Sequence, residues 1–192
     1  MKRLFDIIIA AISLVLLSPV LLIIMVLIKF DSKGPVIFGQ RRVGVNDQEF
    51  TMYKFRTMVV GTPEVATDKL INGEKYITKI GYYLRKYSLD ELPQLVNILA
   101  GEMSFVGPRP ALYNQYDLRQ MRNMLAVSSL RPGLTGWAQI NGRDEISLQQ
   151  KVAQDSFYLQ NRSLMMDLRI MYRTIFSVYS GNGVCVRFSK YI

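Results

Sequence analysis

The sequence contains no histidine and only one cysteine, Cys185, among its 192 residues. The absence of histidine excludes Ser-His and Cys-His nucleophile pairs, histidine-ligated zinc or haem, and acid–base chemistry by imidazole. A single cysteine can form neither an intrachain disulfide nor a thiolate metal site, so the chain suits a reducing compartment. Any catalysis must therefore use carboxylates, lysine, arginine, tyrosine or serine, and we expect the cytoplasmic side.

Negative charge is also scarce, because 15 aspartate and glutamate residues oppose 24 lysine and arginine residues, which gives a net charge of +9. Such an excess needs an anionic partner: nucleic acid, a phosphorylated substrate or an anionic membrane surface. The cations are dispersed, and the sequence has no zinc-finger spacing, RNA-binding aromatic motif or basic region with heptads. We therefore expect no nucleic-acid partner. The length and the 49% of hydrophobic residues predict one domain with a core, and they exclude a disordered chain.

A long apolar segment covers residues 4–28 and is interrupted only by Asp6, Ser13 and Ser18. About 25 residues at about 1.5 Å each form a helix of about 37 Å, which exceeds a hydrocarbon thickness of about 30 Å. The segment is too long for the apolar region of a signal peptide and lacks a small-x-small cleavage site. We expect it to be retained in a phospholipid membrane.

The residues of this segment leave two topologies open. Pro19 follows Ser18 in the middle of the run, and proline removes a helix hydrogen bond and favours a kink, but kinks also occur in spanning helices. Cations flank both ends of the run: Lys2, Arg3, Lys29, Lys33, Arg41 and Arg42. A spanning helix would leave one of these groups outside, against the positive-inside tendency, whereas a re-entrant helix keeps both on the cytoplasmic face.

The remaining residues, 31–192, are predicted to form one catalytic or binding unit beside the membrane helix at 1–30. Two β-prone runs at 35–38 and 50–55 are separated by a polar stretch and predict a β-hairpin. Residues 61–74 are polar and predict a surface loop.

Helical patterns dominate the second half of the chain. Apolar residues with the spacing of one buried helix face occupy positions 92–99, and Gly101 ends that helix. Residues 113–127 and 147–179 are also predicted to be helical, with a loop rich in glycine and proline at 131–142 between them. The second half of 147–179 mixes arginines with bulky apolar and aromatic residues, which suits a helix at a membrane interface, although core helices show this pattern at least as often.

Two adjacent carboxylates, Asp90 and Glu91, precede the helix predicted at 92–99. As an isolated pattern they are explained by capping, because aspartate is a good N-cap and glutamate suits the positive end of the helix dipole. Pro93 is tolerated within the first turn of such a helix.

Arginines give these carboxylates a second interpretation. Arg85 is close in sequence, and Arg109 and Arg131 lie in loops beside prolines. Proline on both sides confines the backbone of Arg109, so its guanidinium can bind a phosphate with little loss of entropy, although a surface turn residue is the plain alternative. Carboxylates and arginines at a helix N-terminus can hold Mg²⁺ and a diphosphate together, and without histidine an aspartate is an economical nucleophile. These residues alone do not name a reaction.

Four longer motifs follow one another along the chain: KFRTM at 54–58, SLDELPQ at 88–94, MSFVGPRP at 103–110 and RPGLTGWAQINGR at 131–143. With these motifs the chain strongly resembles the bacterial monotopic phosphoglycosyl transferases, small enzymes that transfer a sugar phosphate to undecaprenyl phosphate. The resemblance extends from the apolar segment to about Tyr179, and the chain looks like the minimal catalytic form of the family. Several long motifs in the right order argue against coincidence.

The resemblance implies a mainly helical α+β fold in the bacterial inner membrane. Its parts would be a re-entrant membrane helix broken at Ser18 and Pro19, a β-hairpin, and amphipathic interfacial helices around an active site on the cytoplasmic face. It also implies a two-step reaction, in which Asp90 attacks the β-phosphorus of a UDP-sugar, expels UMP and carries the sugar phosphate as an aspartyl ester. Undecaprenyl phosphate then accepts it, which would be the first membrane step of an O-antigen, capsule, exopolysaccharide or glycoprotein pathway.

By the same resemblance, Glu91 is the Mg²⁺-binding carboxylate, and Arg85 and Arg109 occupy phosphate-contacting positions. Lys54, Arg131, Asp155 and Asp167 are further candidates for substrate binding, without individual roles. The competing interpretation is a non-catalytic membrane scaffold that binds lipid-linked sugars. The sequence does not identify the sugar or the glycan pathway, and it leaves a homo-oligomer open.

Overall fold

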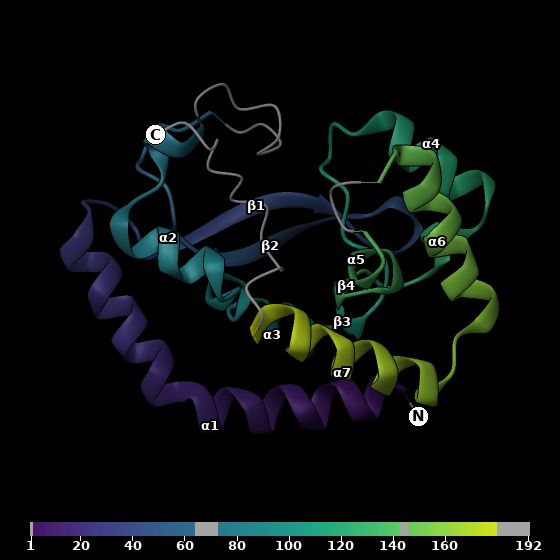
Figure 1. Ribbon diagram of the computed structural model, residues 1–192, viewed down its shortest axis with the longest axis horizontal. Coiled ribbons are helices and arrows are strands. Elements are labelled where there is room, and N and C mark those ends of the chain that lie inside the picture. Colours follow the sequence, from purple (N-terminus) through teal and green to yellow (C-terminus); the bar gives the residue numbers. More distant parts are fainter. Residues whose placement is uncertain (1, 64–72, 143–145, 180–192) are drawn as a thin grey trace.

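The computed structural model describes residues 2–63, 73–142 and 146–179, which form a mainly helical α+β fold, as predicted (Figure 1). Cys185, Arg143 and most of the predicted loop at 61–74 lie outside these ranges. The helices are α1 Lys2–Asp31, α2 Lys79–Lys86, α3 Gln94–Ala100, α4 Tyr116–Met124, α5 Trp137–Ile140, α6 Leu148–Asn161 and α7 Leu164–Tyr179. The strands are β1 Ile37–Val43, β2 Glu49–Phe55, β3 Ser104–Val106 and β4 Gly133–Thr135, and short 3₁₀ turns include η4 Leu89–Glu91.

Helix α1 is the predicted apolar helix, and within the described residues it alone is long and apolar enough to cross a membrane. Its most apolar window has a mean hydropathy of 3.0, and only 11% of that window is buried, so α1 is not a core helix of the domain. Pro19 lies inside the helix, and the Ser18 hydroxyl donates a hydrogen bond to the Val15 carbonyl. Figure 1 shows the axis of α1 changing direction in its middle part, as expected where proline interrupts the helical hydrogen bonds.

The predicted β-hairpin is confirmed by the antiparallel pairing of β1 with β2, from Ile37 opposite Phe55 to Val43 opposite Glu49. The first strand is longer than the β-prone run suggested, because it continues through two arginines to Val43. Asn46 and Asp47 at the tip adopt positive φ angles of 51° and 65°, which these residue types tolerate better than most.

The predicted helix that ends at Gly101 is also confirmed as α3, and Gly101 adopts the left-handed conformation with φ of 91°. Asn97 is fully buried on this helix and links it to the hairpin. Its side-chain oxygen accepts from the Tyr53 amide at 3.0 Å, and its side-chain nitrogen donates to the Thr51 carbonyl at 2.7 Å. These hydrogen bonds hold the next residue of β2, Lys54, at a fixed position beside α3.

The glycine and proline motifs form a close crossing of two chain segments. Strand β3 pairs in parallel with β4, so the prediction of a loop throughout 131–142 was wrong: this range contains β4 and α5. A Cβ atom on Gly133 would lie 2.1 Å from the Gly107 nitrogen, and one on Gly136 would lie 2.1 Å from the Gly107 carbonyl oxygen. Only glycine allows these backbones to approach so closely.

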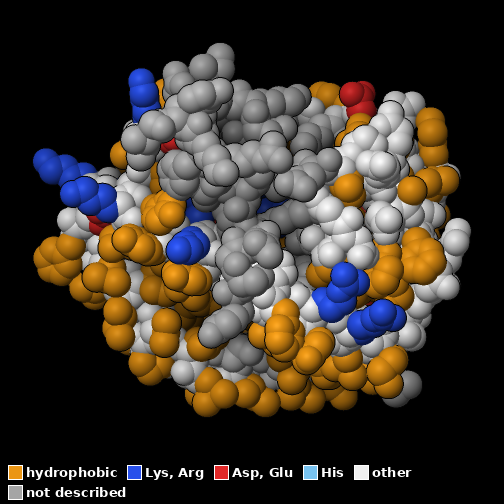
Figure 2. Space-filling view, viewed as in Figure 1, with side chains coloured by type: hydrophobic (Ala, Val, Ile, Leu, Met, Phe, Trp, Pro, Cys, Tyr) orange, Lys and Arg blue, Asp and Glu red, His pale blue; other side chains and the backbone are white. Residues whose placement is uncertain are grey.

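The C-terminal helical region divides into α6 and α7 at Arg162 and Ser163. Ser147 caps α6 through a reciprocal pair of hydrogen bonds with Gln150. Helix α7 lies beside the first half of α1 (Figure 1), and it buries Ile170 while leaving large apolar side chains exposed: Leu164, Met165, Leu168, Tyr172, Ile175 and Phe176. Figure 2 shows hydrophobic side chains gathered along the edge of the molecule formed by α1 and α7.

Candidate active site

Asp90 and Glu91 lie in the 3₁₀ turn η4, between α2 and α3. The capping interpretation of Asp90 was wrong, because α3 begins only at Gln94, Pro93 takes the N-cap position, and no side chain caps the helix there. Ser88 precedes the turn in the left-handed conformation, with φ of 53°, an uncommon conformation for a residue other than glycine. Asp90 is 9% exposed, so the turn buries a carboxylate that α3 does not need.

Cations from two distant segments converge on Glu91. Lys54 of β2 donates to the Glu91 Oε1 atom at 2.8 Å, and Arg109 of the loop after β3 donates to the same atom at 3.2 Å. The side chains of Lys54 and Glu91 are 14% and 12% exposed, so water screens their attraction only weakly. The structure thus brings together three residues that the sequence proposed for one site.

Arg85 joins the same cluster from the last turn of α2. Its Nε atom donates to the Thr57 hydroxyl at 2.9 Å, and Thr57 is buried just after β2. Burial lowers the pKa of Arg85, while the charges of Asp90 and Glu91 raise it. The KFRTM motif therefore supplies both Lys54 and, through Thr57, the support of Arg85.

The electrostatics of Asp90 combine burial with nearby charges of both signs. Burial raises the pKa of Asp90 above its usual range, Lys54 lowers it, Glu91 raises it, and Arg85 and Arg109 lower it. Burial likewise lowers the pKa of Lys54. A carboxylate in such a place is poorly hydrated and lies among cations, which suits it to attack an electrophile that carries negative charge.

Sequence reasoning missed Arg42, which it had assigned only to the cations flanking the apolar run. Arg42 donates to the Pro110 carbonyl at 2.8 Å and to the Gln40 side-chain oxygen at 2.7 and 3.1 Å. Burial lowers the pKa of Arg42 to about 9, the charge of Arg109 lowers it and that of Glu91 raises it, so the guanidinium stays protonated at neutral pH. The register of the hairpin could have revealed Arg42. Phe38 pairs with Lys54, and because side chains alternate along a strand, Arg42 lies on the same face of the hairpin as Lys54.

Three other predicted site residues lie away from the carboxylate pair. Arg131 is exposed and donates to the Gly101 carbonyl at 3.0 Å, at the end of α3 opposite to Asp90. Asp155 is 1% exposed and pairs with Arg122, and Asp167 is 6% exposed and pairs with Lys2 near the N-terminus. The structure therefore unites Lys54, Arg85, Asp90, Glu91 and Arg109, and places these three in other contacts.

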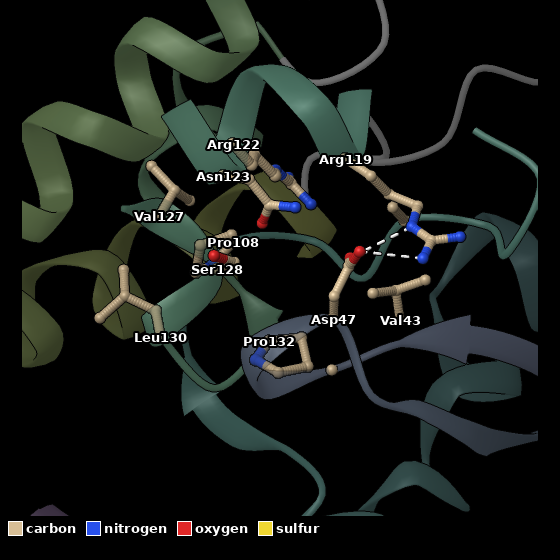
Figure 3. A pocket seen from close by; sticks show the side chains of 12 residues that line it. Val43, Asp47, Pro108, Arg119, Arg122, Asn123, Val127, Ser128, Leu130 and Pro132 are labelled. Carbon is tan, nitrogen blue, oxygen red and sulfur yellow. Dashed lines mark hydrogen bonds and ion pairs between the residues drawn. The ribbon is translucent and has the colours of Figure 1, made fainter. Parts of the chain in front are cut away.

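A small cavity of about 30 Å³ lies on another side of the Arg109 loop, where Pro108, Arg122 and Pro132 form part of its lining (Figure 3). Figure 3 also shows the ion pair of Asp47 with Arg119 at this cavity. Its volume admits about one water molecule. None of Lys54, Arg85, Asp90, Glu91 and Arg109 is among the residues that line this cavity.

The number of carboxylates at Asp90 and Glu91 bears on which metal ions this site could bind. Across residues 2–63, 73–142 and 146–179, no three acidic or thiol side chains gather as a preformed metal cage. Mg²⁺ commonly uses only one or two protein carboxylates and takes its other ligands from water and substrate phosphates. The two carboxylates of Asp90 and Glu91 are compatible in number and chemistry with this mode of Mg²⁺ binding.

Comparison with known proteins now decides the family. The profile described as "Bacterial sugar transferase" matches residues 1–181, which include every element of the cluster. The chain belongs to the bacterial sugar transferase family. The chain is also similar to the exopolysaccharide production protein ExoY of Rhizobium meliloti (strain 1021), which is 44% identical across 95% of this chain and 87% of its own length.

Two longer proteins match this chain over only part of their own length. The UDP-glucose:undecaprenyl-phosphate glucose-1-phosphate transferase of Escherichia coli (strain K12) is 38% identical across 92% of this chain and 39% of its own length. The UDP-N-acetylgalactosamine-undecaprenyl-phosphate N-acetylgalactosaminephosphotransferase of Aeromonas hydrophila is 38% identical across 95% of this chain and 44% of its own length. The bacterial sugar transferase sequence thus accounts for under half of each of these relatives.

Proposed function

We propose that this chain transfers a sugar-1-phosphate from a UDP-sugar to undecaprenyl phosphate, giving undecaprenyl-diphospho-sugar and UMP. The observation that carries this function is the buried Asp90, beside Glu91 and among cations from three segments, in a member of the bacterial sugar transferase family. Relatives named for this reaction, and one named for exopolysaccharide production, support it. We place the reaction at the start of a bacterial glycan pathway.

In the first step, a carboxylate oxygen of Asp90 attacks the β-phosphorus of the UDP-sugar. An O–P bond forms, the bond from that phosphorus to the oxygen bridging to UMP breaks, and UMP leaves with the electron pair. In the second step, a phosphate oxygen of the lipid attacks the same phosphorus and Asp90 leaves as a carboxylate. Two displacements at one phosphorus thus need a single nucleophilic side chain and no histidine.

The cations of the cluster match the charge of the donor substrate. Lys54, Arg85 and Arg109, with Arg42 behind them, oppose the two carboxylates of Asp90 and Glu91, which gives four positive charges minus two negative ones, a net charge of +2. This attracts a nucleotide-sugar diphosphate and stabilises the charge that develops as UMP departs. Mg²⁺ bound with Glu91 as a protein ligand would neutralise further negative charge on the diphosphate.

A panel of UDP-sugars, assayed for UMP release by the purified protein, tests this function. With Mg²⁺ and undecaprenyl phosphate we expect repeated turnover with at least one UDP-sugar, and without the lipid we expect at most about one UMP per enzyme. Binding of UDP-sugars or lipid-linked sugars without any UMP release would instead support the non-catalytic scaffold.

Arg109→Lys tests the phosphate role of this arginine. Lysine keeps the charge but loses the planar pair of donors, so we expect kcat/KM for the UDP-sugar to fall by more than about tenfold, or about 1.4 kcal/mol of transition-state stabilisation. The measurement is the initial rate of UMP release as a function of UDP-sugar concentration. Unchanged kinetics would reduce Arg109 to a turn residue.

We also propose that α1 is re-entrant, because contacts at both of its ends join the same domain. At the first end, Lys2 pairs with Asp167 and donates to the Tyr158 hydroxyl at 2.9 Å. At the other end, Asp31 accepts a hydrogen bond at 3.0 Å from the Ile80 amide at the start of α2. Two ends held on one domain cannot lie on opposite faces of a bilayer, so the exposed apolar face of α1, which runs from Leu4 to Phe30, is left to enter the lipid from one side.

These contacts predict that both ends of α1 lie on the same side of the inner membrane, with the active site, and the cations that flank α1 favour the cytoplasmic side. Single cysteines, one in a short extension before Met1 that leaves Lys2 in place and one at Lys33, in a Cys185→Ser background, should both resist an impermeant thiol reagent in intact spheroplasts and react after lysis. Labelling of only one of them in intact spheroplasts would establish a spanning helix. In a Pro19→Ala variant we expect some molecules to adopt the spanning state, because the substitution restores a helix hydrogen bond.

A further inference from the structure

The loop that carries Arg109 is held by its carbonyl groups, because the prolines on either side of Arg109 have no N–H to donate. Each carbonyl accepts a hydrogen bond from a different part of the chain: Pro108 from the Gly133 amide at 2.9 Å, Arg109 from Arg122 Nη1 at 2.8 Å, and Pro110 from Arg42 Nη1 at 2.8 Å. Two of the three donors are thus guanidinium groups.

Arg122 is itself fixed by a buried carboxylate. It lies on α4 and is 7% exposed, and its Nε and Nη2 atoms donate at 3.0 and 2.6 Å to one oxygen of Asp155, which lies on α6 and is 1% exposed. Because the guanidinium is planar, binding Asp155 along one edge sets the direction of the remaining nitrogen, Nη1. That nitrogen donates to the Arg109 carbonyl, so α6 fixes the Arg109 loop through a single side chain of α4.

We infer that Arg122, oriented by Asp155, is a positioning residue that aims the Arg109 guanidinium at the Glu91 carboxylate and the substrate phosphates. This inference rests on the proposed function. It gives Asp155 a supporting role in the reaction in place of the substrate contact that the sequence suggested, and it accounts for a charged pair that is buried away from Asp90.

The same helix offers a matched control for a purely structural effect. Arg119, one turn before Arg122 on α4, also binds a carboxylate along one edge, with 3.1 and 2.9 Å to the two oxygens of Asp47, and it also donates to a backbone carbonyl, that of Tyr113 at 2.7 Å. Its backbone partner, Tyr113, lies three residues beyond Pro110 and is not one of the three carbonyls that hold Arg109. Arg119→Lys therefore makes the same chemical change on the same helix and leaves the carbonyl contacts of Pro108, Arg109 and Pro110 in place.

Double-mutant cycles that combine Arg109→Ala with substitutions of Arg122 or Asp155 test the inference. In otherwise wild-type protein, we expect Arg122→Lys and Asp155→Asn each to lower kcat/KM for UMP release by about tenfold or more, because Arg109 loses its aim. In an Arg109→Ala background, the same substitutions should change kcat/KM by less than about threefold, because the side chain that they position is gone. Arg119→Lys should have the same small effect in both backgrounds.

Several results would overturn the inference. Equal losses in the wild-type and Arg109→Ala backgrounds would show that the pair supports the fold in general. Wild-type kinetics for both single variants would show that the pair supports nothing in the reaction. Unfolding of both variants, measured by thermal denaturation in the same detergent, would also contradict a role confined to one loop. No UMP release by the wild-type protein would refute the proposed function itself, whereas a failed cycle in an active enzyme refutes only the inference.

Discussion

Asp90→Asn is expected to abolish the covalent sugar-phosphate adduct and reduce turnover to background. The amide has no carboxylate oxygen to attack phosphorus, whereas its size and shape are nearly those of aspartate. The measurement is the intact mass of the protein after incubation with a substrate UDP-sugar and Mg²⁺ but no lipid. Wild-type protein should gain one sugar phosphate, fragmentation should map it to Asp90, and undecaprenyl phosphate should discharge it.

The matched control is Asp117→Asn, which makes the same change at an exposed aspartate in the first turn of α4. This variant should form the adduct as the wild-type protein does. A full-rate Asp90→Asn enzyme, or an adduct mapped to another side chain, would show that the nucleophile has been assigned wrongly.

The raised pKa of Asp90 leads to two expectations. One concerns the stability of the Asp90→Asn variant, and the other concerns the pH dependence of adduct formation by the wild-type enzyme. Because the folded state raises the pKa, mainly by burial, it favours the protonated acid, and stability falls as pH rises from the unfolded pKa through the folded pKa. Asn removes this loss, so the melting temperature at neutral pH should not fall. Adduct formation needs the carboxylate, so its rate should be lost on acidification at a higher pH than an ordinary aspartate would give.

Gly133→Ala is expected to destabilise the protein by about 3 kcal/mol or more, one of the largest effects available from a single methyl group. The added carbon would lie 2.1 Å from the Gly107 nitrogen and 2.2 Å from the Thr135 carbonyl oxygen, and both neighbours are backbone atoms that cannot rotate away. The hydrogen bond from Gly133 to the Pro108 carbonyl would shift as well, so activity should fall together with stability.

Gly44→Ala is the comparison, because its φ of −104° is negative and its Cβ would come no closer than 3.3 Å to a neighbouring atom, at an edge of the Phe50 ring. Both variants can be compared by thermal unfolding in one detergent. A melting temperature for Gly133→Ala within a degree or two of that of Gly44→Ala would show that the crossing of the two segments is looser than described.

The sequence predicted those parts of the fold that local patterns determine. Two β-prone runs and the polar stretch between them predicted the hairpin, and Gly101 correctly marked the end of α3, because each signal acts within a few residues. The loop assigned to 131–142 failed for the opposite reason. Strand β4 exists only because it pairs with β3, from Ser104 opposite Gly133 to Val106 opposite Thr135, and no local pattern reveals such a partner.

The candidate site divides in the same way. Asp90, Glu91, Arg85, Arg109 and Lys54 were proposed from motifs, and the structure brings them together. Arg42 was missed because its contribution depends on the register of the hairpin and on a carbonyl 68 residues away. Whether Arg131, Asp155 and Asp167 contact substrate could not be settled from motifs, because their partners lie on elements distant in sequence. The capping interpretation failed because α3 begins three residues after Glu91.

The attachment of both ends of α1 to one domain has a consequence for the concentration of lipid substrate that governs the rate. In the proposed re-entrant topology the depth of the cation cluster at the membrane is fixed. It would meet lipid acceptors that diffuse in the plane of the bilayer, so their mole fraction among the lipids would set the rate. Dilution of the vesicles with buffer should leave the second displacement unchanged, whereas dilution of the acceptor with inert phospholipid should slow it. Competition among glycan pathways would then be decided by surface density.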